Sequence, residues 1–138
     1  MNSSIKHSLE YYAAGLYCSQ AVFGAFAEKY GLDKKTAFKI SCGLNSGARC
    51  ADVCGAVSGA ILVIGLRYGD YRKKCNAETE EFIRRFTAEN SSIVCRDILA
   101  CDISTPDGKA KAAADNLFKT RCLDMVESAA KILCDLGY

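Results

Sequence analysis

Three cysteines, Cys42, Cys50 and Cys54, fall within one glycine-rich stretch, residues 42–60, that reads CGLNSGARCADVCGAVSGA. Thiols placed in this way can ligate a metal or cluster, or exchange electrons as a dithiol and disulfide. They can also fill a tight helix contact as small apolar side chains. The choice among these three depends on the elements that hold the sulfurs.

Cys50 and Cys54 are four residues apart, which is the spacing of neighbours on one helix face. If a helix begins by Cys50, both sulfurs can ligate one metal or cluster, so we predict Cys50 and Cys54 as cofactor-binding residues. The unpaired amides of a helix N-terminus, with Arg49 beside Cys50, would favour thiolates there. The parallel Cβ bonds suit a disulfide poorly. The opposing interpretation is packing, because the glycines and alanines that follow form a small-residue helix face.

Other cysteines lie further along the chain. Cys95 and Cys101 flank the segment RDILA, and Cys122 opens the last predicted helix, where the helix dipole would favour a thiolate. Cys134 lies in the middle of that helix, and we expect it in the core. The total of nine is odd, so at least one thiol stays free or pairs outside the chain.

Several other kinds of catalytic site are not supported. The chain has one histidine, His7, which we expect on the surface near the N-terminus. A cysteine nucleophile with a histidine base, as in hydrolases, is therefore disfavoured. The glycine-rich stretch lacks the lysine and the spacing of a phosphate-binding loop.

The composition bounds the class of protein. The 138 residues are 50% hydrophobic and 25% charged, with a formal net charge of +2, which indicates one globular domain over residues 1–138 and no nucleic-acid partner. The first residues lack the apolar run of a secretory signal, so we expect a cytoplasmic protein. The longest apolar run, residues 56–66, is too short for a membrane span. Cysteine is normally scarce in a reducing compartment, so nine of them suggest a chemical role for some.

Apolar residues return every three or four positions along the chain, which predicts an all-α fold, a compact bundle of five to seven helices. Gly15 is expected to separate the first two helices, and Gly31 to end the second. Asp33 is the expected N-cap of the third.

The second half of the chain continues the helical pattern. We expect the most hydrophobic helix over residues 52–68 and a helix capped by Asn76 that reads AETEEFIRRFTAEN. Thr105 is the expected N-cap of the next helix, with Pro106 at its first position. The last helix is predicted over about residues 121–136.

Four stretches carry a recognisable cysteine pattern in order along the chain. They read LYCSQAVF, VCGAVSGAILVIGLRYG, VCRDILACDISTPDG and TRCLDMVESAAKIL. From about Gly15 to Leu133, the chain resembles the redox-active family named for its C-GCAxxG-C-C cysteines. The cysteines that recur in that family correspond to Cys18, Cys54, Cys95 and Cys122.

The resemblance implies a redox-active protein, with an iron–sulfur or other prosthetic group proposed for some members. Four cysteines on four helices can meet only if the fold brings the helix ends together, and sequence spacing cannot establish that. This chain departs from the pattern by additional cysteines, which are Cys42, Cys50, Cys75, Cys101 and Cys134.

Our leading hypothesis is a redox centre in which Cys18, Cys54, Cys95 and Cys122 are the catalytic or metal-ligating residues, with Cys50 assisting. They would hold an iron–sulfur cluster or zinc, or act as a dithiol and disulfide pair toward a redox partner protein. The chain could also form a homo-oligomer. The alternative from another class is a non-catalytic structural or partner-binding module, with packing cysteines or a structural zinc.

Overall fold

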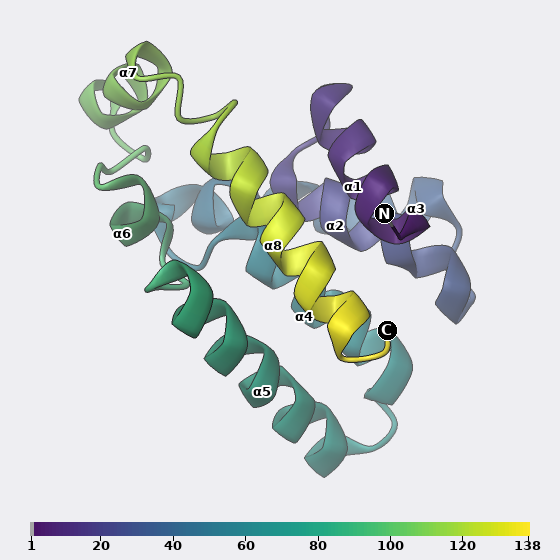
Figure 1. Cartoon of the computed structure of the whole chain (residues 1–138). Coiled ribbons are helices and arrows are strands. Elements are labelled where there is room, and N and C mark those ends of the chain that lie inside the picture. The colour runs from purple at the N-terminus through teal and green to yellow at the C-terminus, as the bar shows by residue number, and fades with distance from the viewer. Residues whose placement is uncertain (1) are drawn as a thin grey trace.

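The computed structural model describes residues 2–138, and in this range the chain forms eight α-helices and no β-strand (Figure 1). The α-helices are α1 (Ser3–Ala13), α2 (Cys18–Ala27), α3 (Lys34–Ser41), α4 (Gly55–Tyr68), α5 (Arg72–Asn90), α6 (Cys95–Leu99), α7 (Pro106–Ala114) and α8 (Arg121–Asp135). Three short helical segments are η1 (Glu28–Tyr30), η2 (Cys42–Leu44) and η3 (Gly47–Ala51). The all-α prediction is confirmed. The expected count of five to seven is wrong, because an element as short as α6 cannot show a helical period.

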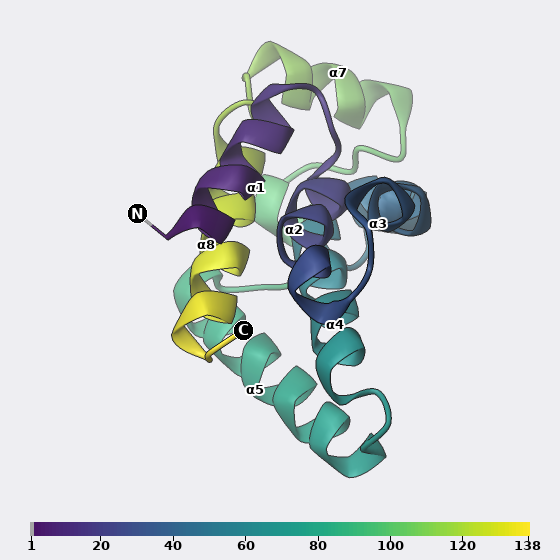
Figure 2. The same ribbon diagram turned by 90° about the vertical axis from the view of Figure 1, so that its right-hand side faces the viewer.

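Helices α2, α4 and α8 form the centre of the bundle. Helix α2 packs against α1, α3, α4 and α8, and α5 packs against α4 and α8. Figure 2 shows α2 between α1 and α3, with α4 beneath it. No helix in residues 2–138 combines the length and the apolarity that crossing a membrane requires.

The close crossing of α2 and α4 depends on two glycines of the CGAVSG hexapeptide. A Cβ on Gly59 would lie 2.7 Å from the Ser19 carbonyl oxygen, and a Cβ on Gly55 would overlap the Cys18 Sγ. Only a residue without a side chain fits at these contacts. The small-residue helix face predicted from the sequence is therefore confirmed.

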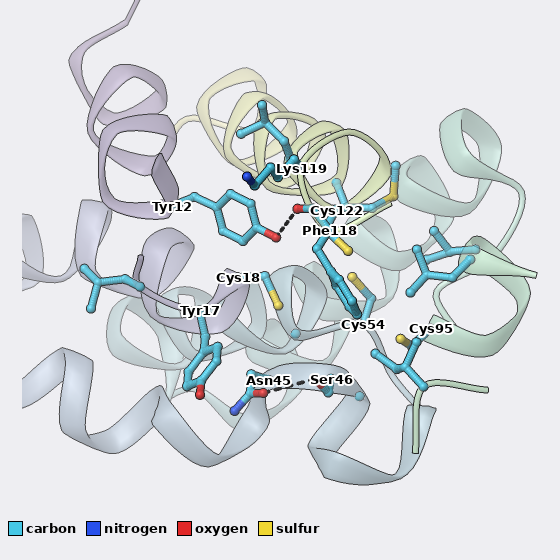
Figure 3. Close-up of a pocket in the computed structure, with 18 of the residues that line it drawn as sticks. Tyr12, Tyr17, Cys18, Asn45, Ser46, Cys54, Cys95, Phe118, Lys119 and Cys122 are labelled. Atoms are coloured by element: carbon cyan, nitrogen blue, oxygen red, sulfur yellow. Dashed lines mark hydrogen bonds between the residues drawn. The ribbon is translucent and has the colours of Figure 1, made fainter. Parts of the chain in front are cut away.

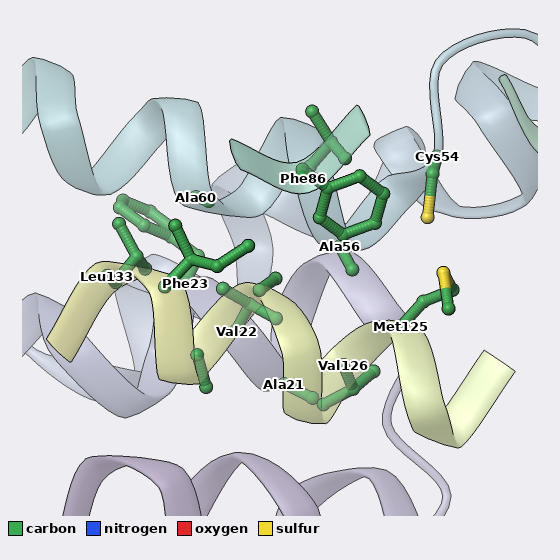
Figure 4. Close-up of a cluster of buried hydrophobic side chains, with 14 of the residues drawn as sticks. Ala21, Val22, Phe23, Cys54, Ala56, Ala60, Phe86, Met125, Val126 and Leu133 are labelled. Carbon is green, nitrogen blue, oxygen red and sulfur yellow. The ribbon is translucent and has the colours of Figure 1, made fainter. Parts of the chain in front are cut away.

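The core lies between α2, α4, α5 and α8 (Figure 4). Phe26, Ile64, Phe82 and Leu133 are fully buried there. Burial of each such side chain contributes about 1.5–3 kcal/mol of transfer free energy. The body of the bundle is thus held by apolar contacts and needs no disulfide.

Most of the expected helix ends are confirmed. Gly15, at φ 101°, lies between α1 and α2, and Gly31, at φ 85°, ends η1, which extends α2. The Asp33 carboxylate accepts the backbone N–H of Thr36 at 2.9 Å and caps α3. Thr105 caps α7 with Pro106 in its first turn, and α8 lies within a residue of its expected range.

Two expected helix starts are wrong. Helix α4 begins at Gly55 rather than at residue 52, because the segment before it forms backbone hydrogen bonds with a distant segment. Helix α5 begins at Arg72, so Asn76 lies inside the helix rather than at its cap. The added first turn reads RKKC, and its charges give no apolar period to detect.

Candidate thiol site

Cys54 and Cys95 are brought together by a single antiparallel bridge between Val53 and Val94. The Cys54 N–H donates to the Ile93 carbonyl and the Cys95 N–H donates to the Asp52 carbonyl, both at 2.7 Å. Because side chains alternate along paired segments, both cysteines project from the face opposite the two valines. Cys54 then caps α4 and Cys95 begins α6, so two helix starts meet at the bridge.

Cys18 is the first residue of α2, and it reaches the start of α4. Its Sγ packs against Gly55, where no Cβ intervenes. The backbone N–H groups of Ser46 and Ala56 face this sulfur, and those of Ala56 and Val57 face the sulfur of Cys54. Because Gly55 has no side chain, the sulfurs of Cys18 and Cys54 both lie near the backbone N–H of Ala56.

Cys122 lies in the first turn of α8, beside Tyr12 of α1. The Tyr12 hydroxyl donates to the Phe118 carbonyl and is also within hydrogen-bonding reach of the Cys122 sulfur (Figure 3). This contact joins the N-terminal helix to the loop before α8. It places a phenol oxygen next to a thiol.

Cys18, Cys54, Cys95 and Cys122, the pocket cysteines, line one cavity of about 680 Å³, which we call the thiol pocket (Figure 3). Cys54 and Cys95 are only 8% exposed, whereas Cys18 and Cys122 are half-buried. All nine cysteines are free thiols. The structure therefore brings together the four cysteines that the sequence singled out.

Burial dominates the electrostatics of these thiols. It raises the pKa of Cys18 and strongly raises that of Cys54. It also raises the pKa of Cys95 to about 11 and that of Cys122 to about 12. The expectation that helix N-termini stabilise thiolates at Cys54 and Cys122 is therefore wrong, because a helix terminus offers only about 0.3–1 kcal/mol and desolvation exceeds it.

The charge of Cys18 affects the pKa of each of the other three pocket cysteines. After burial, the charge of Cys18 is the largest cause of the raised pKa of Cys54, of Cys95 and of Cys122. One thiolate in the pocket thus opposes the formation of a second, since like charges in low dielectric repel strongly. In the reduced pocket, the pKa of one thiol therefore depends on whether its neighbours are protonated.

Cys50 does not share a helix face with Cys54. It lies in η3, where Ala48 and Arg49 have φ values of 56° and 65°, and α4 begins only at Gly55. Its thiol is exposed and donates to the Gly47 carbonyl at 3.3 Å. The predicted pair of ligands on one helix is therefore wrong in geometry, because the backbone between the two cysteines is not helical.

The other cysteines differ in their distance from the pocket. Cys101 contributes to the raised pKa of Cys95 and of Cys122, so it lies within electrostatic reach of the site. Cys42 is exposed, and Cys75 and Cys134 are half-buried in α5 and α8. The last three do not line the thiol pocket. His7 is exposed, as expected.

Sequence reasoning missed two parts of the site. Tyr12 gave no signal, because its partner Phe118 is far along the chain. The segment from Ser46 to Arg49 lines the pocket with a left-handed backbone at residues other than glycine, including Ser46 at φ 54°. Residues that carry a side chain rarely adopt this backbone conformation, so no local propensity predicts it.

The pocket cysteines match the ligands of a metal centre in chemical type but not in arrangement. Four thiolates would suit zinc or an iron–sulfur cluster by chemical type. Within residues 2–138, however, no group of three or more cysteine, histidine or acidic side chains is arranged to hold a metal ion. Metal ligation by the pocket cysteines stays a prediction.

The sequence that forms this site matches one family model. Residues 16–136 match the family model described as "Putative redox-active protein (C_GCAxxG_C_C)". No curated protein and no solved structure matches the chain. The matched range contains all four pocket cysteines and the helices that begin at them, whereas Tyr12 lies before it.

Proposed function

This chain belongs to the C_GCAxxG_C_C family, and on that premise we propose that its pocket cysteines exchange electrons with a disulfide-bearing partner by cycling between dithiol and disulfide. One observation carries the proposal: four cysteines from four separate segments line one open pocket. Packing alone does not require four sulfurs to face a common cavity.

The reaction begins when one pocket thiol loses its proton and its sulfur attacks a sulfur of the partner disulfide. A bond forms between protein and partner while the partner S–S bond breaks, and the released partner thiolate takes up a proton. A second pocket cysteine then attacks the protein sulfur of the mixed disulfide and releases the other partner thiol. Two protein thiols are oxidised to one disulfide, and the partner disulfide is reduced to two thiols.

We assign the attacking role to Cys122. It is half-buried and lines the pocket, and the Tyr12 hydroxyl lowers its pKa against the effect of burial. Cys18 is assigned as the second cysteine, because it lines the same pocket and its charge has the largest effect of any charge on the pKa of Cys122. Burial raises the pKa of the more deeply buried Cys54 and Cys95, so both are uncharged thiols in the reduced state.

A redox-buffer titration tests this function. Protein purified without oxygen is equilibrated over a range of dithiothreitol ratios, and its free thiols are counted. We expect one reversible two-electron couple that is lost in Cys18→Ala and in Cys122→Ala. The matched control is Cys134→Ala, which removes the same side chain from α8 away from the pocket and should leave the couple unchanged.

Two results would contradict the proposal. A couple that survives both pocket substitutions would assign the redox chemistry to other cysteines. The absence of any couple in folded protein would favour the alternative, a helical module whose cysteines only pack. Analysis of iron, acid-labile sulfide and zinc on the same preparation tests the predicted metal centre separately.

A further inference from the structure

The rim of the thiol pocket is cationic. Arg49, Lys109 and Lys119 line it and are exposed, and no aspartate or glutamate of residues 2–138 lines it. The Arg49 guanidinium donates to the Asn45 side-chain oxygen at 2.9 Å, which fixes its position. A ligand in this pocket therefore meets positive charge that no acidic lining residue offsets.

A second recess continues the pocket at one end. It has a volume of about 320 Å³ and shares Arg49 and Lys109 with the thiol pocket. Hydroxyl-bearing residues Ser46, Ser104 and Thr105 also line it. In the same turn, Asp102 accepts the backbone N–H of Ser104 and lines neither cavity. The hydroxyls of Ser46, Ser104 and Thr105 already donate to Asn45 and Asp102, so this end of the site offers an anionic group the two cations.

The remaining wall of the thiol pocket is apolar. Its side chains include Leu16, Ile98, Leu99, Phe118 and Met125. The sulfurs of Cys54 and Cys95 lie at its base, only 8% exposed. A disulfide on the surface of a folded protein could not reach them without inserting its own backbone among these side chains. A small molecule with an apolar body fits this volume and lining better.

From this arrangement we infer that the partner of the pocket cysteines is a small-molecule disulfide with an apolar body and a carboxylate, bound with its sulfurs at the cysteines and its carboxylate between Arg49 and Lys109. The inference rests on the proposed function and names its substrate class. Two pocket thiols are oxidised to a disulfide, and the ligand disulfide takes up two electrons and two protons to become a dithiol.

Lipoate and lipoamide are the matched probes for this inference. Both carry the same five-membered cyclic disulfide on the same aliphatic chain, and they differ only in ending as a carboxylate or as a neutral amide. Reduced protein is mixed with an excess of either probe at low ionic strength, and the dithiol product is quantified by chromatography. We expect lipoate to react about three- to tenfold faster, and the difference to shrink as salt screens the rim.

Charge substitutions locate the carboxylate. Lys109→Gln should slow the reaction with lipoate about two- to fivefold and leave that with lipoamide unchanged. Lys111→Gln is the control, because Lys111 lies on the same helix, is exposed and lines neither cavity. It should change neither rate.

The outcomes separate the substrate class from the function. Equal rates for the two probes, unaffected by Lys109→Gln, would overturn the inferred carboxylate site and leave the thiol chemistry intact. Failure of both probes to react, with the two-electron couple still present in redox buffer, would overturn the small-molecule substrate. Absence of the couple itself would overturn the proposed function.

Discussion

The last helix, α8, carries a cysteine near each end, and the two lie in different surroundings. Cys122 begins the helix in the thiol pocket, where Cys18 and Cys95 lie close enough to raise its pKa. Cys134 lies about 18 Å further along the helix axis, given 1.5 Å per residue. There the charged neighbours that affect its pKa are Lys29 and Asp135, with no second sulfur among them.

The comparison shows that burial does not distinguish the thiol proposed to react from one outside the pocket. Both cysteines are half-buried, and burial raises the pKa of both. They differ in the part of the bundle that surrounds them. At the pocket end, four segments begin at or beside a cysteine, whereas the body of the bundle is closed by side chains such as Phe26, Phe82 and Leu133.

The largest expected effect lies in the closed body rather than in the pocket. Phe82→Ala removes a fully buried ring and should lower the free energy of unfolding by about 3–5 kcal/mol. Cys122→Ala removes one half-buried sulfur and should cost about 1 kcal/mol or less. Urea unfolding under reducing conditions measures both. If Cys122→Ala lowers the free energy of unfolding as much as Phe82→Ala does, the pocket has a structural role instead.

The second effect is the pH dependence of the redox couple. Because the pKa of each pocket cysteine is raised, to about 11 for Cys95 and about 12 for Cys122, reduction takes up two protons throughout neutral and mildly alkaline pH. The midpoint potential should therefore fall by about 59 mV per pH unit, twice the 29.6 mV of a tenfold change. This slope should persist from pH 6 to pH 10.

Potentials measured in redox buffers across this range check the slope. A slope that halves near neutral pH would mean that one pocket thiol is already a thiolate there. The pocket would then resemble a site with an activated cysteine, and the dominance of burial over the helix termini would be wrong.

The third effect separates two glycines of the same helix. Gly59→Ala places a Cβ 2.7 Å from the Ser19 carbonyl oxygen, and we expect a loss of about 1–3 kcal/mol in unfolding free energy as α2 is pushed from α4. Gly65→Ala meets nothing within 4 Å and should stabilise α4 by about 0.5–1 kcal/mol. Thermal or urea unfolding measures both. Equal effects of the two substitutions would refute the close crossing.

The smallest effect concerns Tyr12. Tyr12→Phe removes the hydrogen bond to the Phe118 carbonyl and should cost about 0.5–1.5 kcal/mol of stability. It should also raise the pKa of Cys122 further, because the Tyr12 hydroxyl lowers it in the native protein. Thiolate absorbance during a pH titration follows this change.

The control for Tyr12 is Tyr71→Phe, since Tyr71 is 67% exposed and does not line the pocket. It should change neither the stability nor the titration of Cys122. An unchanged Cys122 titration in Tyr12→Phe would leave Tyr12 with a structural role only.

The helices and the identity of the pocket cysteines could be predicted from sequence because both are local patterns. Asp33 and Thr105 cap helices through hydrogen bonds within three residues of themselves. The glycines after Cys54 indicate a small-residue face whichever helix packs on it. The cysteine spacing that identifies the family is likewise read directly along the chain.

The geometry of the site could not be predicted, because it depends on contacts between distant segments. Cys54 and Cys95 meet through the bridge of Val53 and Val94, which no local propensity encodes. Because the backbone near Arg49 is left-handed, Cys50 does not lie in the helix predicted for it. Burial of the thiols, which reversed the expected direction of their pKa shifts, also exists only after the helices pack.

Mapping of the first disulfide by mass spectrometry tests the central claim most directly. Protein reduced and purified without oxygen is treated with one equivalent of a two-electron thiol oxidant, alkylated and digested. We predict that the first disulfide joins Cys18 to Cys122, while Cys75 and Cys134 remain alkylated thiols. If instead the pocket cysteines stay reduced while the exposed Cys42 and Cys50 form disulfides, the pocket is not the redox centre of this protein.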